Sequence, residues 1–259
     1  MWWVALVACG GGERFPLGVS LRDGQVIVGE VRTDTLRLEG VFGTVEVPLD
    51  DVGMVVPVEG ATLGESHDQV TVWLRNGSEL RGRWTEPELA MGLSIGGEHV
   101  GVDLPTDDIG AIQLRGGAEW PSADLYRVRT THGDDILVDP SSTRIEIENE
   151  LGTFSPFLSE CVRVGPVGDP SGPWRVELTS GTILVGPLRQ EELHLELPAG
   201  PERVDLPLAQ LVAIDRTVWA TPVPVHAAAV SSAPARTRRG KLEEADGWFR
   251  NDLLEDAKR

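Results

Sequence analysis

Three carboxylates gather in one short stretch of this sequence, and of all its side chains they come closest to a metal-binding set. Asp134 and Asp135 follow His132-Gly133, and Asp139 lies a few residues further along. Carboxylate oxygens are the ligands that Ca²⁺ prefers in proteins. The spacing does not match an EF-hand loop, and a chain with a formal net charge of −18 is expected to carry acidic loops. We therefore predict no metal site here and assign His132-Gly133 to a turn.

Histidine and cysteine are the other residues that could bind a metal ion or act as a nucleophile. The five histidines are scattered and form no His-x-x-x-His pair; they are His67, His99, His132, His194 and His226. The two cysteines form no Cys-x-x-Cys pair, and Cys161 is expected to be a half-buried structural thiol. We predict no catalytic residue, no metal ligand, no cofactor and no small-molecule substrate.

The elements that hold these residues recur along the chain. Turn glycines at 24, 77, 133 and 181 are separated by 53, 56 and 48 residues, which indicates tandem modules. Each glycine follows a strand of alternating apolar residues, and pairs such as Asp23-Gly24 and Asn76-Gly77 predict type I′ hairpins with positive φ at both positions. Gly29, Gly82 and Gly186 then predict a bulge or a sharp bend in the second strand.

Two further strands, a Pro-initiated 3₁₀ turn and a fifth strand complete each module. The 3₁₀ turns are predicted at Pro48, Pro105, Pro156 and Pro207. This order resembles an SH3-like small barrel, and Leu21-Arg22-Asp23-Gly24 with Gly29 resembles the first motif of Sm-like barrels. The resemblance implies an all-β fold of four tandem five-stranded barrels. It leaves open whether the barrels are separate or exchange strands. The modules are predicted at 17–60, 68–117, 124–168 and 173–217.

The charge balance bears on which partners the chain can bind. There are 23 basic and 41 acidic residues. Nucleic-acid binding depends on cations that displace phosphate counterions, so we expect this acidic chain not to bind nucleic acid. For the same reason, the RNA binding of Sm proteins is not carried over.

The first residues, 1–16, resemble a signal and lipidation segment. Leu6-Val7-Ala8-Cys9 resembles the lipobox of bacterial lipoproteins, and glycines follow it. The resemblance implies that Cys9 carries a lipid anchor in a membrane. It also implies a periplasm-facing location in the bacterial envelope, at the outer membrane.

The last part of the chain changes in composition. Residues 220–240 are rich in Pro and Ala and predict a linker. Residues 241–259 show apolar residues at helical spacing and predict an amphipathic helix. The helix either folds back onto a barrel or docks on a partner through Leu242, Trp248, Phe249 and Leu253.

These features predict a non-enzymatic, membrane-tethered scaffold or binding protein. It would recognise a protein or cell-wall component through its barrel surfaces and its C-terminal helix. Two alternatives stay open: a Sm-like nucleic-acid-associated module in the cytoplasm, and an accessory subunit of an enzyme complex.

Overall fold

The computed structural model describes residues 17–58, 69–114, 124–168 and 172–217. All of them belong to the first of two compact units, Met1–Pro222 and Val223–Arg259. Strands dominate these residues, and the only helical segments within them are four short 3₁₀ turns. The all-β prediction is therefore confirmed.

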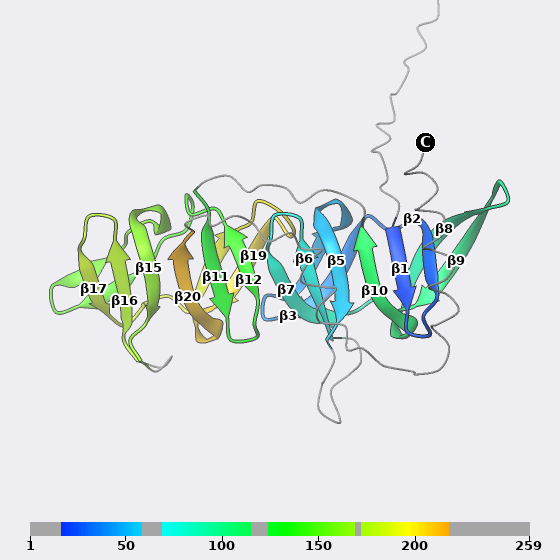
Figure 1. The fold of residues 1–259 in the computed structure, drawn as a ribbon. Coiled ribbons are helices and arrows are strands. Elements are labelled where there is room, and N and C mark those ends of the chain that lie inside the picture. The colour runs from blue at the N-terminus through cyan, green and yellow to red at the C-terminus, as the bar shows by residue number, and fades with distance from the viewer. Residues whose placement is uncertain (1–16, 59–68, 115–123, 169–171, 218–259) are drawn as a thin grey trace, which may run out of the picture. The chain divides into compact units, whose positions relative to one another are not determined.

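Four strands, a 3₁₀ turn and a fifth strand follow one another four times, and we call each set a module (Figure 1). Module 1 has β1 (Leu17–Leu21), β2 (Val26–Val31), β3 (Thr35–Gly40), β4 (Gly43–Pro48), η1 (Leu49–Asp51) and β5 (Val52–Pro57). Module 2 has β6 (Gln69–Leu74), β7 (Glu79–Trp84), β8 (Glu88–Ile95), β9 (Glu98–Pro105), η2 (Thr106–Asp108) and β10 (Ile109–Leu114). Module 3 has β11 (Tyr126–Thr130), β12 (Asp135–Val138), β13 (Ile147–Asn149), β14 (Gly152–Phe154), η3 (Leu158–Glu160) and β15 (Cys161–Pro166). Module 4 has β16 (Trp174–Leu178), β17 (Ile183–Gly186), β18 (Glu192–Glu196), β19 (Arg203–Pro207), η4 (Leu208–Gln210) and β20 (Leu211–Arg216).

Each module opens with a hairpin that turns at the predicted glycine, but the turn is not type I′. Only glycines have positive φ among the described residues, whereas a type I′ turn needs two such positions. In module 2 the Gly77 N–H donates to the Leu74 carbonyl at 3.0 Å, and the Leu74 N–H donates to the Ser78 carbonyl at 2.8 Å. The same two bonds occur in the other three modules. The loop therefore has three residues and ends in one left-handed glycine, so His132 needs no positive φ.

The 3₁₀ turns lie where the prolines predict them. Pro48, Pro105 and Pro207 each directly precede one. In module 3 the turn begins two residues after Pro156, and the Phe157 N–H donates to the Glu160 carboxylate at 2.9 Å.

Modules 1 and 2 exchange strands. β2 of module 1 pairs with β8 of module 2, and β7 of module 2 pairs with β3 of module 1. The fifth strands cross over as well, because β10 pairs with β1 and β5 pairs with β6. β5 and β10 also pair with each other. The two modules are thus related as the halves of a strand-exchanged pair, which answers the question that the sequence leaves open.

Modules 3 and 4 repeat this exchange. β20 pairs with β11, β15 pairs with β16, and β15 and β20 pair with each other. The Glu148 N–H donates to the Pro187 carbonyl, and the Asp139 N–H donates to the Glu196 carbonyl, so each third strand lies beside the other module. The two pairs of modules meet where β12 lies beside β7. The sheet order therefore runs from β17 through β12 and β7 to β2, β8 and β9 (Figure 1).

The glycines within the second strands make room for the exchanged hairpins. A Cβ on Gly29 would lie 2.5 Å from the Gly92 carbonyl oxygen, and one on Gly82 would lie 2.8 Å from that of Glu39. No register shift occurs in β2 or β7 at these glycines, so a bulge is not found there; β7 stays paired with β6 past Gly82, whereas Gly29 is the last residue of β2 on β1 before the strand pairs with β8. Close approach of a neighbouring backbone explains why both residues are glycines.

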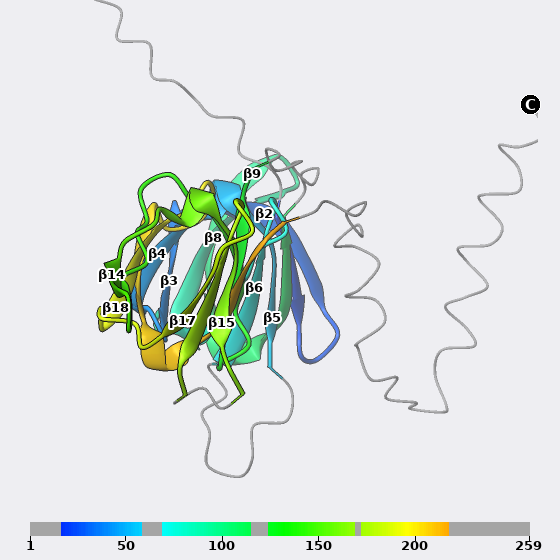
Figure 2. The same ribbon diagram turned by 90° about the vertical axis from the view of Figure 1, so that its left-hand side faces the viewer.

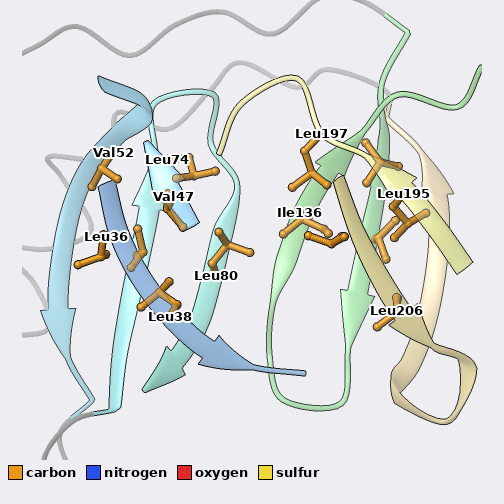
Figure 3. Packing of buried hydrophobic residues seen from close by; sticks show 14 of the residues in the cluster. Leu36, Leu38, Val47, Val52, Leu74, Leu80, Ile136, Leu195, Leu197 and Leu206 are labelled. Carbon is orange, nitrogen blue, oxygen red and sulfur yellow. The ribbon is translucent and has the colours of Figure 1, made fainter. Parts of the chain in front are cut away.

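The strands form two layers with the core between them. In the end-on view, β3, β4, β14 and β18 lie on one side, and β15, β6 and β5 lie on the other (Figure 2). Leu36 and Leu38 of β3 belong to one buried cluster with Leu74, Leu80 and Ile136 (Figure 3). No sheet closes into a barrel among the described residues, so four closed barrels are not confirmed. The exchanged hairpins account for this, because the strands that would close one module pair with another.

The predicted C-terminal helix and the predicted lipidation segment lie outside the described residues. Within the described part of the chain, no helix is long and apolar enough to cross a membrane.

Candidate interaction surfaces

The acidic stretch of module 3 lies at the contact between β7 and β12. Asp134 is buried, and its carboxylate joins the two strands. Oδ1 accepts the Arg81 backbone N–H at 2.6 Å, and Oδ2 accepts the Thr130 hydroxyl at 2.5 Å. Burial raises the pKa of Asp134, and these hydrogen bonds offset only part of that rise. The carboxylate therefore has a structural task that explains its burial.

The other two carboxylates of the stretch have separate partners. Asp135 lies opposite Glu79, and its Oδ1 is 3.2 Å from Arg127 Nε. Burial raises the pKa of Asp135. Asp139 Oδ1 accepts the Ser141 N–H at 2.8 Å. In the described ranges, no group of three or more His, Cys, Asp or Glu side chains is arranged to hold a metal ion.

The contact between β7 and β12 is nearly symmetrical, and we call it the junction. Its residues are Ser78, Glu79, Arg81, Asp134, Asp135 and Leu137. Ser78 Oγ accepts the Leu137 N–H at 3.0 Å, just as Asp134 Oδ1 accepts the Arg81 N–H. On each strand, the first residue after the turn glycine supplies the oxygen and the fourth supplies the N–H. A hairpin tip of module 4 also crosses the junction, because the Gly200 N–H donates to Asp51 Oδ2 at 2.8 Å.

Apolar side chains are exposed on β2 and β17, toward the two ends of the sheet order. Val26 on β2 is 67% exposed, and Val28 on the same strand is exposed too. At the opposite end, Ile183 on β17 is 49% exposed and Val185 is exposed beside it. In the described structure, residues 26–28 pair only with β1 and residues 183–186 pair only with β16. Each end therefore offers unpaired backbone groups together with apolar side chains.

Hairpins next to these ends add to the apolar surface. Leu151, at the tip of β13–β14, is 85% exposed. Ile95 and Val100 on β8 and β9 and Phe154 on β14 are also exposed. Eight of the twelve exposed large apolar side chains in the described ranges thus lie on β2, β17 or the hairpins next to them. The other four are Val58, Val162, Val167 and Val212.

Two small hollows lie near Trp84. One is bordered by Val55, Val70 and Thr106, and the other by Leu36 and Glu86. Their volumes are about 10 and 20 Å³. A space of this size holds about one water molecule.

One serine has the spacing of a hydrolase nucleophile, although no catalytic residue is predicted from the sequence. Ser94 lies in Gly92-Leu93-Ser94-Ile95-Gly96. The structure places it in β8, directly opposite His99 of β9, and both residues are exposed. No hydrogen bond joins their side chains in the described structure. A nucleophile of this motif sits on a strand-to-helix turn, whereas Ser94 lies within a regular hairpin, so the local structure does not match that motif.

Cys161 is buried and begins β15, so the predicted half-buried thiol is in fact fully covered. Burial raises the pKa of the Cys161 thiol to about 12. The Tyr126 hydroxyl donates to the Cys161 carbonyl at 2.5 Å. A thiol with so high a pKa is a poor nucleophile, in agreement with a structural role.

The remaining predicted site residues lie outside the described residues: Cys9, Leu242, Trp248, Phe249 and Leu253. Two histidines, His67 and His226, lie there too. Of the others, His194 is exposed and its Nδ1 lies 2.6 Å from Asp205 Oδ1, and His99 lies in β9.

No model of a known protein family matches this chain, and neither a curated protein nor a solved structure matches it.

Proposed function

We propose that the chain is a non-enzymatic scaffold or binding protein that recognises a protein or cell-wall component through the two ends of its sheet. The observation that carries the proposal is the gathering of exposed apolar side chains there, including Val26, Ile183 and Leu151. Exposed apolar patches on soluble domains mark interaction sites. An unpaired strand edge adds a row of backbone donors and acceptors that a partner strand can complete.

The use of polar groups inside the fold supports a binding role over catalysis. Asp134 and Ser78 are buried, and each accepts a backbone N–H from the neighbouring strand. Thr143, also buried, donates its hydroxyl to the His194 carbonyl at 2.8 Å. The hydrogen-bonding capacity of these groups is used to hold neighbouring strands together.

The envelope location is part of the proposal and is supported by the sequence alone. A lipid on Cys9 tethers the protein to a membrane, with its modules on the periplasmic side. The segment 241–259 supplies a second contact through Leu242, Trp248, Phe249 and Leu253.

We also propose that each module derives from an SH3-like or Sm-like small barrel. The support is the order of four strands, a 3₁₀ turn and a fifth strand, which occurs four times. In this view, exchange of the third and fourth strands between neighbours has joined the barrels into two pairs.

A photo-crosslinking experiment tests the binding role. A photoreactive amino acid replaces Val26 or Ile183 in the full chain, which is produced in its native envelope. Matched controls carry it at Val162 or Val212, which are exposed valines on β15 and β20. We expect adducts with a polypeptide or with cell-wall material at the two ends and none at the controls. Equal labelling at all four positions, or none at the ends, would contradict the proposal. Intact mass measurement of the same membrane fraction shows whether the chain begins at an acylated Cys9.

A further inference from the structure

The junction shows how two modules of this chain meet edge to edge. It joins the second strand of module 2, β7, to the second strand of module 3, β12. The second residue after each turn glycine, Glu79 on one strand and Asp135 on the other, lies opposite its counterpart. Oxygen acceptors on the first residues, Ser78 and Asp134, bind N–H groups across the contact.

The second strand of module 4, β17, ends the sheet order, and residues 26–28 of the second strand of module 1, β2, pair on one side only, before β2 reaches β8 at Glu30. The same positions on these two strands are exposed. Val26 and Ile183 are the second residues after their turn glycines. Their register on β1 and β16 matches the register of Glu79 on β6 and of Asp135 on β11. The first residues after the turn glycines again carry side-chain oxygens, and the fourth are valines; they are Gln25, Thr182, Val28 and Val185.

The turns between the third and fourth strands of modules 1 and 3 also differ in how exposed their apolar residues are. Gly43 and Gly152 are equivalent glycines, both with positive φ, in the third-to-fourth strand turns of modules 1 and 3. In module 1, Phe42 just before this glycine packs half-buried against the core. In module 3 the equivalent residue, Leu151, is 85% exposed. The β3–β4 tip of module 1 is thus partly covered, whereas the β13–β14 tip of module 3 presents an apolar residue to solvent.

We infer that the β17 edge of one chain pairs with the β2 edge of a second copy of this chain, in the register of the junction. Self-association of this kind presupposes the proposed function, in which the two ends are recognition surfaces. Ile183 then lies opposite Val26, while Thr182 and Gln25 accept the N–H groups of Val28 and Val185 from the facing chain. Cross-strand pairs of β-branched residues stabilise antiparallel strands.

The order of modules sets the direction of assembly. Within one chain, the junction joins an even-numbered module, 2, to an odd-numbered one, 3. If module 4 likewise joins an odd-numbered module, that module is module 1 of the next copy. The contact between copies is therefore head-to-tail. A head-to-tail contact is heterologous and leaves a free edge at each end of the assembly, which permits chains longer than a dimer.

Side-chain chemistry favours a second copy of this chain as the partner that pairs with each edge. At the junction, Glu79 and Asp135 are like charges, and each has an arginine nearby: Arg81 Nη2 lies 2.7 Å from Glu79, and Arg127 Nε lies 3.2 Å from Asp135. At the ends the corresponding residues are apolar on both edges, so each end is complementary to the other. Each chain carries a net charge of −18, and repulsion between copies is expected to limit association at low ionic strength.

Sedimentation velocity of the full 259-residue chain, over a range of concentrations, tests this assignment. We expect species larger than a dimer in the wild type, in greater amount at higher salt. Val26→Lys blocks the β2 edge and Ile183→Lys blocks the β17 edge, so each variant alone should be monomeric. An equimolar mixture of the two should form a dimer and nothing larger, because only one edge of each variant remains. Val162→Lys and Val212→Lys serve as matched controls and should assemble like the wild type.

Disulfide trapping gives a second measurement that does not depend on the lysine variants. In a Cys9→Ser background, Val26→Cys mixed with Ile183→Cys should form a disulfide between chains, and neither variant should do so alone. A wild type that stays monomeric at every concentration and salt overturns the assignment. So does a dimer of Ile183→Lys by itself, since this requires β2 to pair with β2.

The outcomes separate this assignment from the binding role. If the chain is monomeric while a photoreactive residue at Val26 captures a different polypeptide, self-association is wrong and the binding role stands. If the chain is monomeric and both ends remain unlabelled in the native envelope, both are wrong.

Discussion

Replacement of Asp134 by alanine tests whether the junction depends on its buried carboxylate. The change removes the acceptors of the Arg81 N–H, at 2.6 Å, and of the Thr130 hydroxyl, at 2.5 Å. A buried N–H left without an acceptor costs about 1–3 kcal/mol. Removal of a buried charge offsets part of this cost, so we expect the free energy of unfolding to fall by about 1–2 kcal/mol.

Asparagine at the same position separates the hydrogen bond from the charge. Asp134→Asn keeps an oxygen for the Arg81 N–H and carries no charge, so it should be at least as stable as the wild type at neutral pH. Burial raises the pKa of Asp134 in the folded state. Between the unfolded and the folded pKa, the folded protein therefore holds a proton that the unfolded chain has lost. The associated stability is fully present below the unfolded pKa and disappears as the pH rises through the folded pKa.

Urea unfolding followed by tryptophan fluorescence, from about pH 4 to pH 7, measures both effects. The wild type should lose more stability than Asp134→Asn over this range. Asp135, whose pKa burial also raises, is present in both proteins and cancels in the comparison. Asp23→Ala is the control, because Asp23 accepts the Gln25 N–H in an exposed turn. An alanine variant as stable as the wild type, or an asparagine variant as unstable as the alanine one, would refute the reasoning.

Three further predictions concern the junction, the strand exchange and the core. Ser78→Ala removes the acceptor of the Leu137 N–H and should lower the free energy of unfolding by about 1–3 kcal/mol in the same urea assay. Gly29→Ala places a Cβ 2.5 Å from the Gly92 carbonyl oxygen and should lower the free energy of unfolding by about 1–3 kcal/mol or more. Gly18→Ala on the adjacent strand is the control: the nearest atom is 3.8 Å away, so the free energy of unfolding should change by less than about 0.5 kcal/mol. In a Cys9→Ser variant at pH 8, a thiol reagent should label Cys161 only after the protein is unfolded in urea, because burial raises the pKa of the folded thiol to about 12. Rapid labelling of the folded protein would contradict the buried thiol.

Local structure was predictable wherever a few neighbouring residues determine it. The Asn76-Gly77 and Asp23-Gly24 pairs located their hairpins, because a glycine in the left-handed region closes the loop at no steric cost. The turn type was wrong, since asparagine and aspartate tolerate positive φ without requiring it. Pro48 located its 3₁₀ turn because proline fixes φ and needs no N–H partner there.

The strand exchange could not be predicted, because an exchanged hairpin and a retained one satisfy the same local pattern. β8 shows the same alternation of buried residues whether it pairs with β7 or with β2. A signal was nevertheless present in Gly29 and Gly82, where only glycine leaves room for the backbone of the other module. A single sequence gives no means of distinguishing this reason from a bulge.

Differences between equivalent residues carry the information that the repeated pattern conceals. The position two residues after the turn glycine is acidic in modules 2 and 3, which meet at the junction, and β-branched in modules 1 and 4, which form the ends. An exposed edge strand usually carries charged residues that discourage pairing with another chain. Val26 and Ile183 do the opposite, and the residues before them, Gln25 and Thr182, carry the oxygens that the junction uses. If the two ends had only to keep the protein soluble, acidic residues would serve better there and β-branched residues would serve better at the junction. The junction would then not need the arginines that now offset the charges of Glu79 and Asp135.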